Sequence, residues 1–157
     1  TFAPGAPTLP GYLLLSRYDG TARRHIDELV SMADGKVLYT WRPDADALLA
    51  DAPRTSLVAD FTGWDNEHYR TIHPFLLADG SLIIKDHQNY AMRIDACSKR
   101  LWLQDKLLAH HSTESDGEGG VWMPGLIEPP TFTDVQPDWR EDAFLHLDAD
   151  GNILSME

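Results

Sequence analysis

Residues 72–85 read Ile-His-Pro-Phe-Leu-Leu-Ala-Asp-Gly-Ser-Leu-Ile-Ile-Lys. Two short apolar runs flank Ala78-Asp79-Gly80, whose residue types favour a tight reversal, so this stretch predicts a β-hairpin. Strands and turns of the same kind recur at Tyr12–Ser16, Asp34–Trp41, Tyr90–Trp102 and Phe144–Met156. Hairpins that restart every few dozen residues are typical of a β-propeller or another array of stacked sheets.

We therefore expect an all-β chain, with about three four-stranded blades of an incomplete β-propeller over residues 11–157. Residues 1–10 are rich in Pro, Gly and Ala and predict an extended leader. Asp44–Ala52 is the one segment with a helical composition, and a strand is expected at Ser56–Phe61. Gly120–Met123 predicts a short strand, and the four prolines in residues 124–140 predict a long irregular insertion.

The charge balance excludes one class of partner. The chain has 25 acidic and 13 basic residues, a formal net charge of −12, and no run of Lys or Arg. Nucleic acid and anionic membrane surfaces both require a positive patch, so we expect no nucleic-acid partner. No apolar stretch reaches the roughly 18 residues that a membrane span needs.

The single cysteine, Cys97, excludes a disulfide within the chain and lies in a predicted turn, where we expect a tolerated rather than a catalytic residue. The chain begins with Thr1 and ends in a predicted strand without a closing element, so we expect it to be a fragment of a longer protein.

Seven histidines are the main candidates for chemistry. His110 and His111 end a predicted strand before a glycine-containing loop. Because adjacent strand residues point to opposite faces, we expect only one of them to reach a given site. His73 opens the hairpin described above, and Pro74 restricts it to extended backbone. The alternative is structural: two solvated imidazoles at a strand end, and a structural histidine at a strand start.

Other sites are weakly supported or excluded. No zinc or metalloprotease spacing occurs, and Asp148–Asn152 resembles a calcium loop but is better explained as a hairpin turn. No phosphate cradle, nucleophile elbow or dinucleotide fingerprint occurs, so we expect no metal and no cofactor. Arg93 and Arg70 are candidate anion clamps, because a guanidinium matches sulfate or phosphate geometry.

Taken together, these motifs resemble the arylsulfotransferase-type β-propeller family, from about Pro10 to the end of the chain. The matching segments are strands and turns that occur in the family's order, namely Pro10–Ser16, Asp34–Trp41, His73–Ile83, Met92–Asp95 with Leu101-Trp102, His110–Ser112 with Gly119–Pro124, and Glu141–Phe144 with Asp148–Leu154.

The resemblance implies a six-bladed propeller that is periplasmic or secreted, or anchored to a membrane through a segment outside this chain. It implies transfer of a sulfuryl group between phenolic compounds through a sulfated histidine, with other histidines and an arginine near the propeller axis. By position, His73 and His110 or His111 match the family's funnel histidines, and Arg93 completes the candidate catalytic set. The chain departs from the family in holding only about three blades, and the family's sulfated histidine belongs to later ones.

The implied chemistry suits these residues, because a neutral imidazole is a competent nucleophile and cationic neighbours stabilise the sulfuryl oxygens. A phenolic or aryl sulfate substrate would then be the small-molecule partner. Two alternatives stay open: a non-catalytic propeller that acts as a binding or scaffold module, and a hydrolase or lyase that acts on another ester. Open propeller edges also predict self-association.

Overall fold

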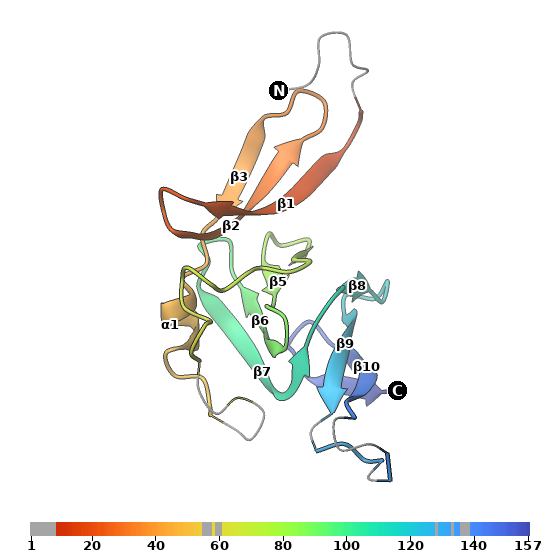
Figure 1. Ribbon diagram of the computed structural model, residues 1–157. Coiled ribbons are helices and arrows are strands. Elements are labelled where there is room, and N and C mark those ends of the chain that lie inside the picture. Colours follow the sequence, from red (N-terminus) through yellow and green to blue (C-terminus); the bar gives the residue numbers. More distant parts are fainter. Residues whose placement is uncertain (1–8, 55–57, 59–60, 128, 133, 136–138) are drawn as a thin grey trace.

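The computed structural model describes residues 9–54, 58, 61–127, 129–132, 134–135 and 139–157 (Figure 1). The protein is all-β, as the sequence predicts, and its sheets are antiparallel. A small sheet holds β1 (Tyr12–Asp19), β2 (Arg24–Ser31) and β3 (Val37–Trp41) in that order. One short helix, α1 (Ala45–Leu49), follows within the described residues.

The remaining strands form an eight-stranded sheet that consists of two meanders. The first meander runs in sequence order through β4 (Phe75–Leu76), β5 (Leu82–Ile84), β6 (Asn89–Ile94) and β7 (Arg100–Ala109). The second runs through β8 (Glu114–Ser115), β9 (Val121–Ile127), β10 (Glu141–Leu147) and β11 (Ile153–Met156).

The two meanders are joined where β7 pairs with β9, at Leu108 opposite Leu126 and Ala109 opposite Gly125. Neither the small sheet nor the large one closes on itself within the described residues.

The hairpin turns form because an aspartate organises each one. Asp79 Oδ1 accepts hydrogen bonds from the backbone N–H of Ser81 at 3.0 Å and from the Ser81 hydroxyl at 2.6 Å, and Gly80 takes a φ of +83°. In the last hairpin, Asp148 Oδ1 accepts from the backbone N–H groups of Asp150 and Asn152, each at 2.9 Å. An aspartate that binds its own backbone two residues on makes an Asx-turn. The segment that resembles a calcium loop is therefore a hairpin turn, as the sequence indicates.

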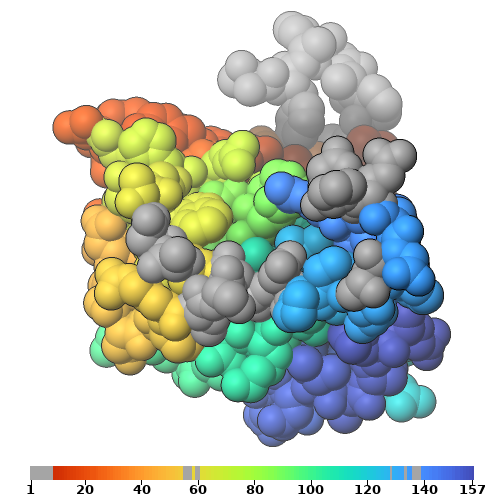
Figure 2. Space-filling view, turned by 60° about the horizontal axis from the view of Figure 1, so that its bottom comes forward, coloured from red at the N-terminus to blue at the C-terminus, as the bar shows by residue number. Residues whose placement is uncertain are grey.

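Apolar residues stack the three units into layers. Alternate residues of a strand face opposite sides of its sheet, and both sides of β5 are buried. Leu82 and Ile84 belong to a core cluster that contains Trp41 of β3, whereas Ile83 belongs to a second cluster that contains Val121 of β9 and other second-meander residues. The first meander therefore lies between the small sheet and the second meander. In Figure 2 the green and teal first meander lies between the orange and yellow segment around α1 and the blue and violet second meander.

The outer faces of this stack remain exposed and apolar. On the small sheet, Leu13, Leu15 and Val37 are exposed, and on the second meander Phe144 and Leu154 are exposed. The outer layers are thus covered on one face only, in contrast to the first meander. No helix among the described residues is long and apolar enough to cross a membrane.

Several local predictions are confirmed. The hairpin of residues 72–85 forms as β4 and β5, and β6 occupies Asn89–Ile94. The helical segment is α1, whose N-cap, Asp44, accepts a hydrogen bond from the backbone N–H of Ala47 at 3.1 Å.

The irregular insertion predicted at residues 124–140 is partly wrong, because β9 continues to Ile127. Pro124 is accommodated since its missing N–H is not needed there, while its carbonyl accepts a hydrogen bond from the backbone N–H of His110 at 3.0 Å. The strand expected at residues 56–61 and residues 1–8 of the leader lie largely outside the described residues.

Candidate functional site

Three histidine rings lie together at one end of the first meander. His110 and His111 directly follow β7, and His87 lies in the connection between β5 and β6. The ring centroids are 4.8 Å apart for His110 and His111, 5.6 Å for His87 and His111, and 6.1 Å for His87 and His110. We call these three residues the histidine cluster.

The two adjacent histidines do not diverge as a continuous strand would require. β7 ends at Ala109, and His111 takes a φ of +54°, in the left-handed region that a non-glycine residue rarely adopts. This turn of the backbone brings Nδ1 of His110 to within 2.6 Å of Nδ1 of His111. The expectation that the pair would point to opposite faces was therefore wrong. Backbone strain of this kind occurs most often at functional sites.

An exposed carboxylate determines how the protons of this pair are arranged. Asp142, on β10, lies 3.0 Å from Nε2 of His110 through its Oδ1 atom. An ionised carboxylate only accepts hydrogen bonds, so His110 donates from Nε2 and, when neutral, has a bare Nδ1. His111 then donates from its own Nδ1, which leaves Nε2 of His111 without a proton. Asp142, His110 and His111 thus form a relay that presents one unprotonated imidazole nitrogen on an exposed ring.

A buried lysine lies beside the cluster. Lys85 follows β5 and is fully buried, and its Nζ donates to Thr113 Oγ1 at 2.6 Å and to the carbonyl of Ile72 at 3.3 Å. Burial lowers the pKa of the Lys85 amine to about 8. Thr113, itself buried, is two residues from His111, so their Cα atoms are at most about 7 Å apart.

Two buried aspartates continue the polar region toward the small sheet. Asp86 accepts from the backbone N–H of His87 at 2.6 Å, and its Oδ1 lies 3.3 Å from Nε of Arg70. Asp27, on β2, accepts from the Thr71 hydroxyl at 2.7 Å through Oδ1, but its Oδ2 has no hydrogen-bond partner among the described residues. Burial raises the pKa of Asp27 to about 7, against the hydrogen bonds from Thr71 and Ser16, which lower it.

Two of the predicted site residues lie apart from this cluster. His73 is exposed, with a φ of +44°, and none of the ring contacts of the histidine cluster includes it. Its backbone is therefore not the extended one that Pro74 predicts, because the chain bends just before β4. His110 and His111 are brought together as described, so the structure joins only part of the predicted set.

Arg93 lies toward the far end of β6 from the histidine cluster. Arg93 is four residues along β6 from Asn89, which begins the strand at the histidine end, a distance of about 13 Å. Its guanidinium donates to Ser81 Oγ at 2.8 Å, to Asp79 Oδ2 at 2.7 Å and to the carbonyl of Ala149 at 2.7 Å. Arg93 therefore ties two hairpin turns together, and the structure does not place it against the histidines.

Sequence reasoning assigned no role to four residues of this region: His87, Asp142, Lys85 and Thr113. For Lys85 to His87 a signal was available, since charged residues directly follow the fully apolar strand β5. For Asp142 and Thr113 there was none, because their roles depend on the pairing of β7 with β9 and β9 with β10.

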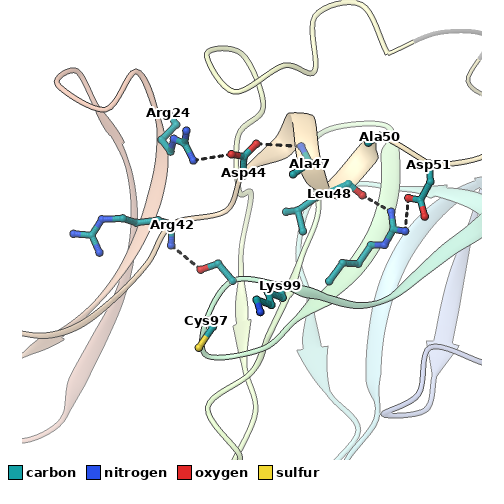
Figure 3. Close-up of a pocket in the computed structure, with 11 residues that line it drawn as sticks. Arg24, Arg42, Asp44, Ala47, Leu48, Ala50, Asp51, Cys97 and Lys99 are labelled. Carbon is teal, nitrogen blue, oxygen red and sulfur yellow. Dashed lines mark hydrogen bonds and ion pairs between the residues drawn. The ribbon is translucent and has the colours of Figure 1, made fainter.

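A separate pocket, of about 550 Å³, lies between α1, the end of β3 and the turn between β6 and β7 (Figure 3). Arg24 and Asp44 form an ion pair at 3.4 Å on its wall, and Arg100 binds Asp51 and the carbonyl of Leu48. The exposed thiol of Cys97 lies at its rim, in the turn that the sequence predicts. None of the seven histidines lines this pocket.

Comparison with models of known protein families gives no match for this chain, and a search among curated proteins finds no significant match either. Within the described residues, no group of three or more His, Cys, Asp or Glu side chains is arranged to hold a metal ion.

Proposed function

We propose that the three stacked layers are successive blades of a β-propeller of the arylsulfotransferase type. The order of the strands supports this, because each meander is a run of neighbouring antiparallel strands and each layer packs face to face on the next. The exposed apolar outer faces of the first and last layers also suit a stack that continues at both sides. Export to the periplasm or the cell exterior belongs to this proposal, and cell fractionation tests it.

We further propose that the protein transfers a sulfuryl group from an aryl sulfate to a phenol through His111. The observation that carries this proposal is the relay of Asp142, His110 and His111, which leaves Nε2 of His111 unprotonated and exposed. A nucleophile held in one tautomer by a base that is itself oriented by a carboxylate is the recurring arrangement of covalent catalysis.

The steps balance without a cofactor. The lone pair of His111 Nε2 attacks sulfur, the bond between sulfur and the aryl oxygen breaks, and the phenolate leaves with the electron pair and takes a proton from water. The sulfated ring keeps its Nδ1 proton, which donates a hydrogen bond to Nδ1 of His110, and the hydrogen bond from His110 to Asp142 stabilises the positive charge on the ring. An acceptor phenol then attacks sulfur, loses its proton to water, and the electron pair returns to Nε2.

The test is transfer from 4-nitrophenyl sulfate to phenol, followed by release of 4-nitrophenolate and formation of phenyl sulfate. His111→Ala should abolish transfer, and Asp142→Asn should reduce it by about 10²-fold to 10⁴-fold, because the wrong tautomer of His110 is then stabilised. His68→Ala is the matched control, since His68 is exposed and, among the described residues, bonds only to nearby Asp65.

Sulfate on the protein after reaction with donor alone, found by mass spectrometry at His111, would support the covalent step. Transfer at the normal rate in the folded His111→Ala protein would refute the proposed role of His111, and the absence of transfer in the unaltered protein would favour a binding module.

The exposed apolar faces favour a second candidate function, association with another copy of this chain. Phe144 and Leu154 lie on the open face of the second meander, and burial of such a face against a second copy would release water from apolar surface. Sedimentation over a range of protein concentrations tests this. Phe144→Lys should shift the equilibrium to monomer, whereas a monomer at all concentrations would exclude self-association.

A further inference from the structure

Lys85 is a buried cation that no carboxylate neutralises. Its side chain is fully buried, and among the described residues no Asp or Glu oxygen lies within 4.0 Å of its Nζ. A buried charge without a partner is costly, so native proteins retain one rarely. Desolvation is the one cause of the lowered pKa of Lys85, in agreement with the missing counter-charge.

The hydrogen bonds of Lys85 determine what Thr113 can do. A protonated lysine only donates, so Thr113 Oγ1 accepts from Nζ at 2.6 Å. The hydrogen of the Thr113 hydroxyl must then point elsewhere, and no described residue accepts it. Thr113 keeps 8% of its surface exposed and lies two residues from His111 in the chain.

We propose that Thr113 and Lys85 form an oxyanion-binding pair, in which the Thr113 hydroxyl donates to a sulfuryl oxygen of the bound aryl sulfate. Lys85 acts as a positioning residue, because it touches Thr113 and not the substrate. This inference rests on the proposed function for the identity of the anion, and it assigns to the site a residue pair that lies outside the histidine relay.

Two physical effects make this pair effective. A hydroxyl that accepts from an ammonium group becomes a stronger donor, since hydrogen bonds in a chain polarise one another. The positive charge is also held in a region of low dielectric, where its field at the anion is screened less than in water. The missing counter-charge of Lys85 is then supplied by the substrate, at a site of a protein whose net charge is −12.

The experiment measures binding of inorganic sulfate to the purified protein by isothermal titration calorimetry, with no transfer reaction involved. Thr113→Val should weaken sulfate binding by about tenfold, the usual effect of removing one hydrogen bond to a charged group, and Thr113→Ser should restore it. Thr71→Val is the matched control, because Thr71 is also a buried threonine that donates to a side chain, Asp27, and we expect it to leave sulfate affinity unchanged.

Lys85→Met separates a binding role from a structural one. It removes a buried charge and keeps most of the side-chain volume, so the melting temperature should rise while the sulfate affinity falls. A residue with only a structural role would instead lower the melting temperature and leave the affinity of the folded protein unchanged.

Sulfate binding that is absent from the unaltered protein, or equal in Thr113→Val and the unaltered protein, would overturn the inference. Loss of binding in Thr113→Val together with no aryl sulfate transfer in the unaltered protein would keep the oxyanion pair and reject the proposed function. The two can therefore fail separately.

Discussion

The two ends of the first meander differ in which residues adopt left-handed backbone and in how their turns are held together. At the turn end, around Asp79-Gly80 and Asp95–Lys99, glycine or serine takes the left-handed positions, and hydrogen bonds from Arg93 join the hairpins. The histidine end comprises Lys85–Asn89 and Ala109–Thr113. Here the left-handed positions are taken by residues with larger side chains, Gln88 and His111.

An unpaired buried atom also lies at the histidine end. The buried side-chain atoms without a partner among the described residues are His25 Nδ1, Asp27 Oδ2, Tyr69 Oη and Asn89 Nδ2. Asn89 begins β6 at the histidine end. Burial raises the pKa of Tyr69, and the charges of Asp86 and Asp27 raise it further. Strain and unsatisfied polar groups are expected at functional sites and are removed elsewhere. The turn end is held together by hydrogen bonds from Arg93, whereas the histidine end contains strained backbone and an unpaired buried amide.

Asp27→Asn should give the largest effect if this contrast is right. Because the pKa of Asp27 is raised from 3.8 to about 7, the folded state of the unaltered protein loses stability as the pH rises from about 4 to about 7. Asparagine never ionises, so the variant should be more stable by on the order of 4 kcal/mol at pH 8 and by close to zero at pH 4. Urea unfolding at both pH values measures the difference, and an equal gain at both would contradict the role of ionisation.

Arg93→Ala should have the next largest effect, at the turn end. The substitution removes three hydrogen bonds of a mostly buried guanidinium and should destabilise the fold by about 2 to 3 kcal/mol. Aryl sulfate transfer by the protein that remains folded should be unchanged. If the folded variant lost transfer while keeping normal stability, Arg93 would have the catalytic role that the sequence suggested.

The difference between two glycine substitutions is the smallest of the three expected effects, and it shows how closely the layers fit at the turn end. Gly151 and Gly80 share a φ of +83°, but a Cβ on Gly151 would meet Trp102 at 2.7 Å, whereas one on Gly80 would meet nothing within 4 Å. We expect Gly80→Ala to cost about 1 kcal/mol from backbone strain alone. Gly151→Ala should cost about 2 kcal/mol more, because the indole must move. Thermal unfolding of the two variants compares their stabilities. Equal losses of stability would mean that the Trp102 indole moves aside without cost.

The sequence was informative wherever a structure is made by neighbouring residues. The Asp-Gly turns, the alternation in β6 and the short helix within Asp44–Ala52 all depend on contacts within a few residues, and each was predicted. The double histidine was recognised as a candidate for the same reason. The site around the double histidine was not predicted. Asp142 lies 32 residues from His110 in the chain and reaches it only because β7 pairs with β9 and β9 pairs with β10.

The bent backbone at His111 and His73 also escaped prediction. A positive φ is unfavourable for a histidine, so the local sequence does not predict it at either residue. Such a conformation persists because the surrounding structure holds it in place. Arg93 was misleading for a related reason: a guanidinium that joins two turns and one that holds an anion have the same appearance in a sequence.

The joint between the two meanders has a mechanical consequence. β7 and β9 are paired at two positions, Leu108 with Leu126 and Ala109 with Gly125. His110 directly follows β7, in the first meander, and its hydrogen-bond partner Asp142 lies on β10, in the second. The distance between His110 Nε2 and Asp142 Oδ1 therefore depends on the angle between the two meanders. Because the two meanders also pack against each other through the core cluster that contains Ile83 and Val121, the packing of this apolar core fixes the angle on which the contact between His110 and Asp142 depends.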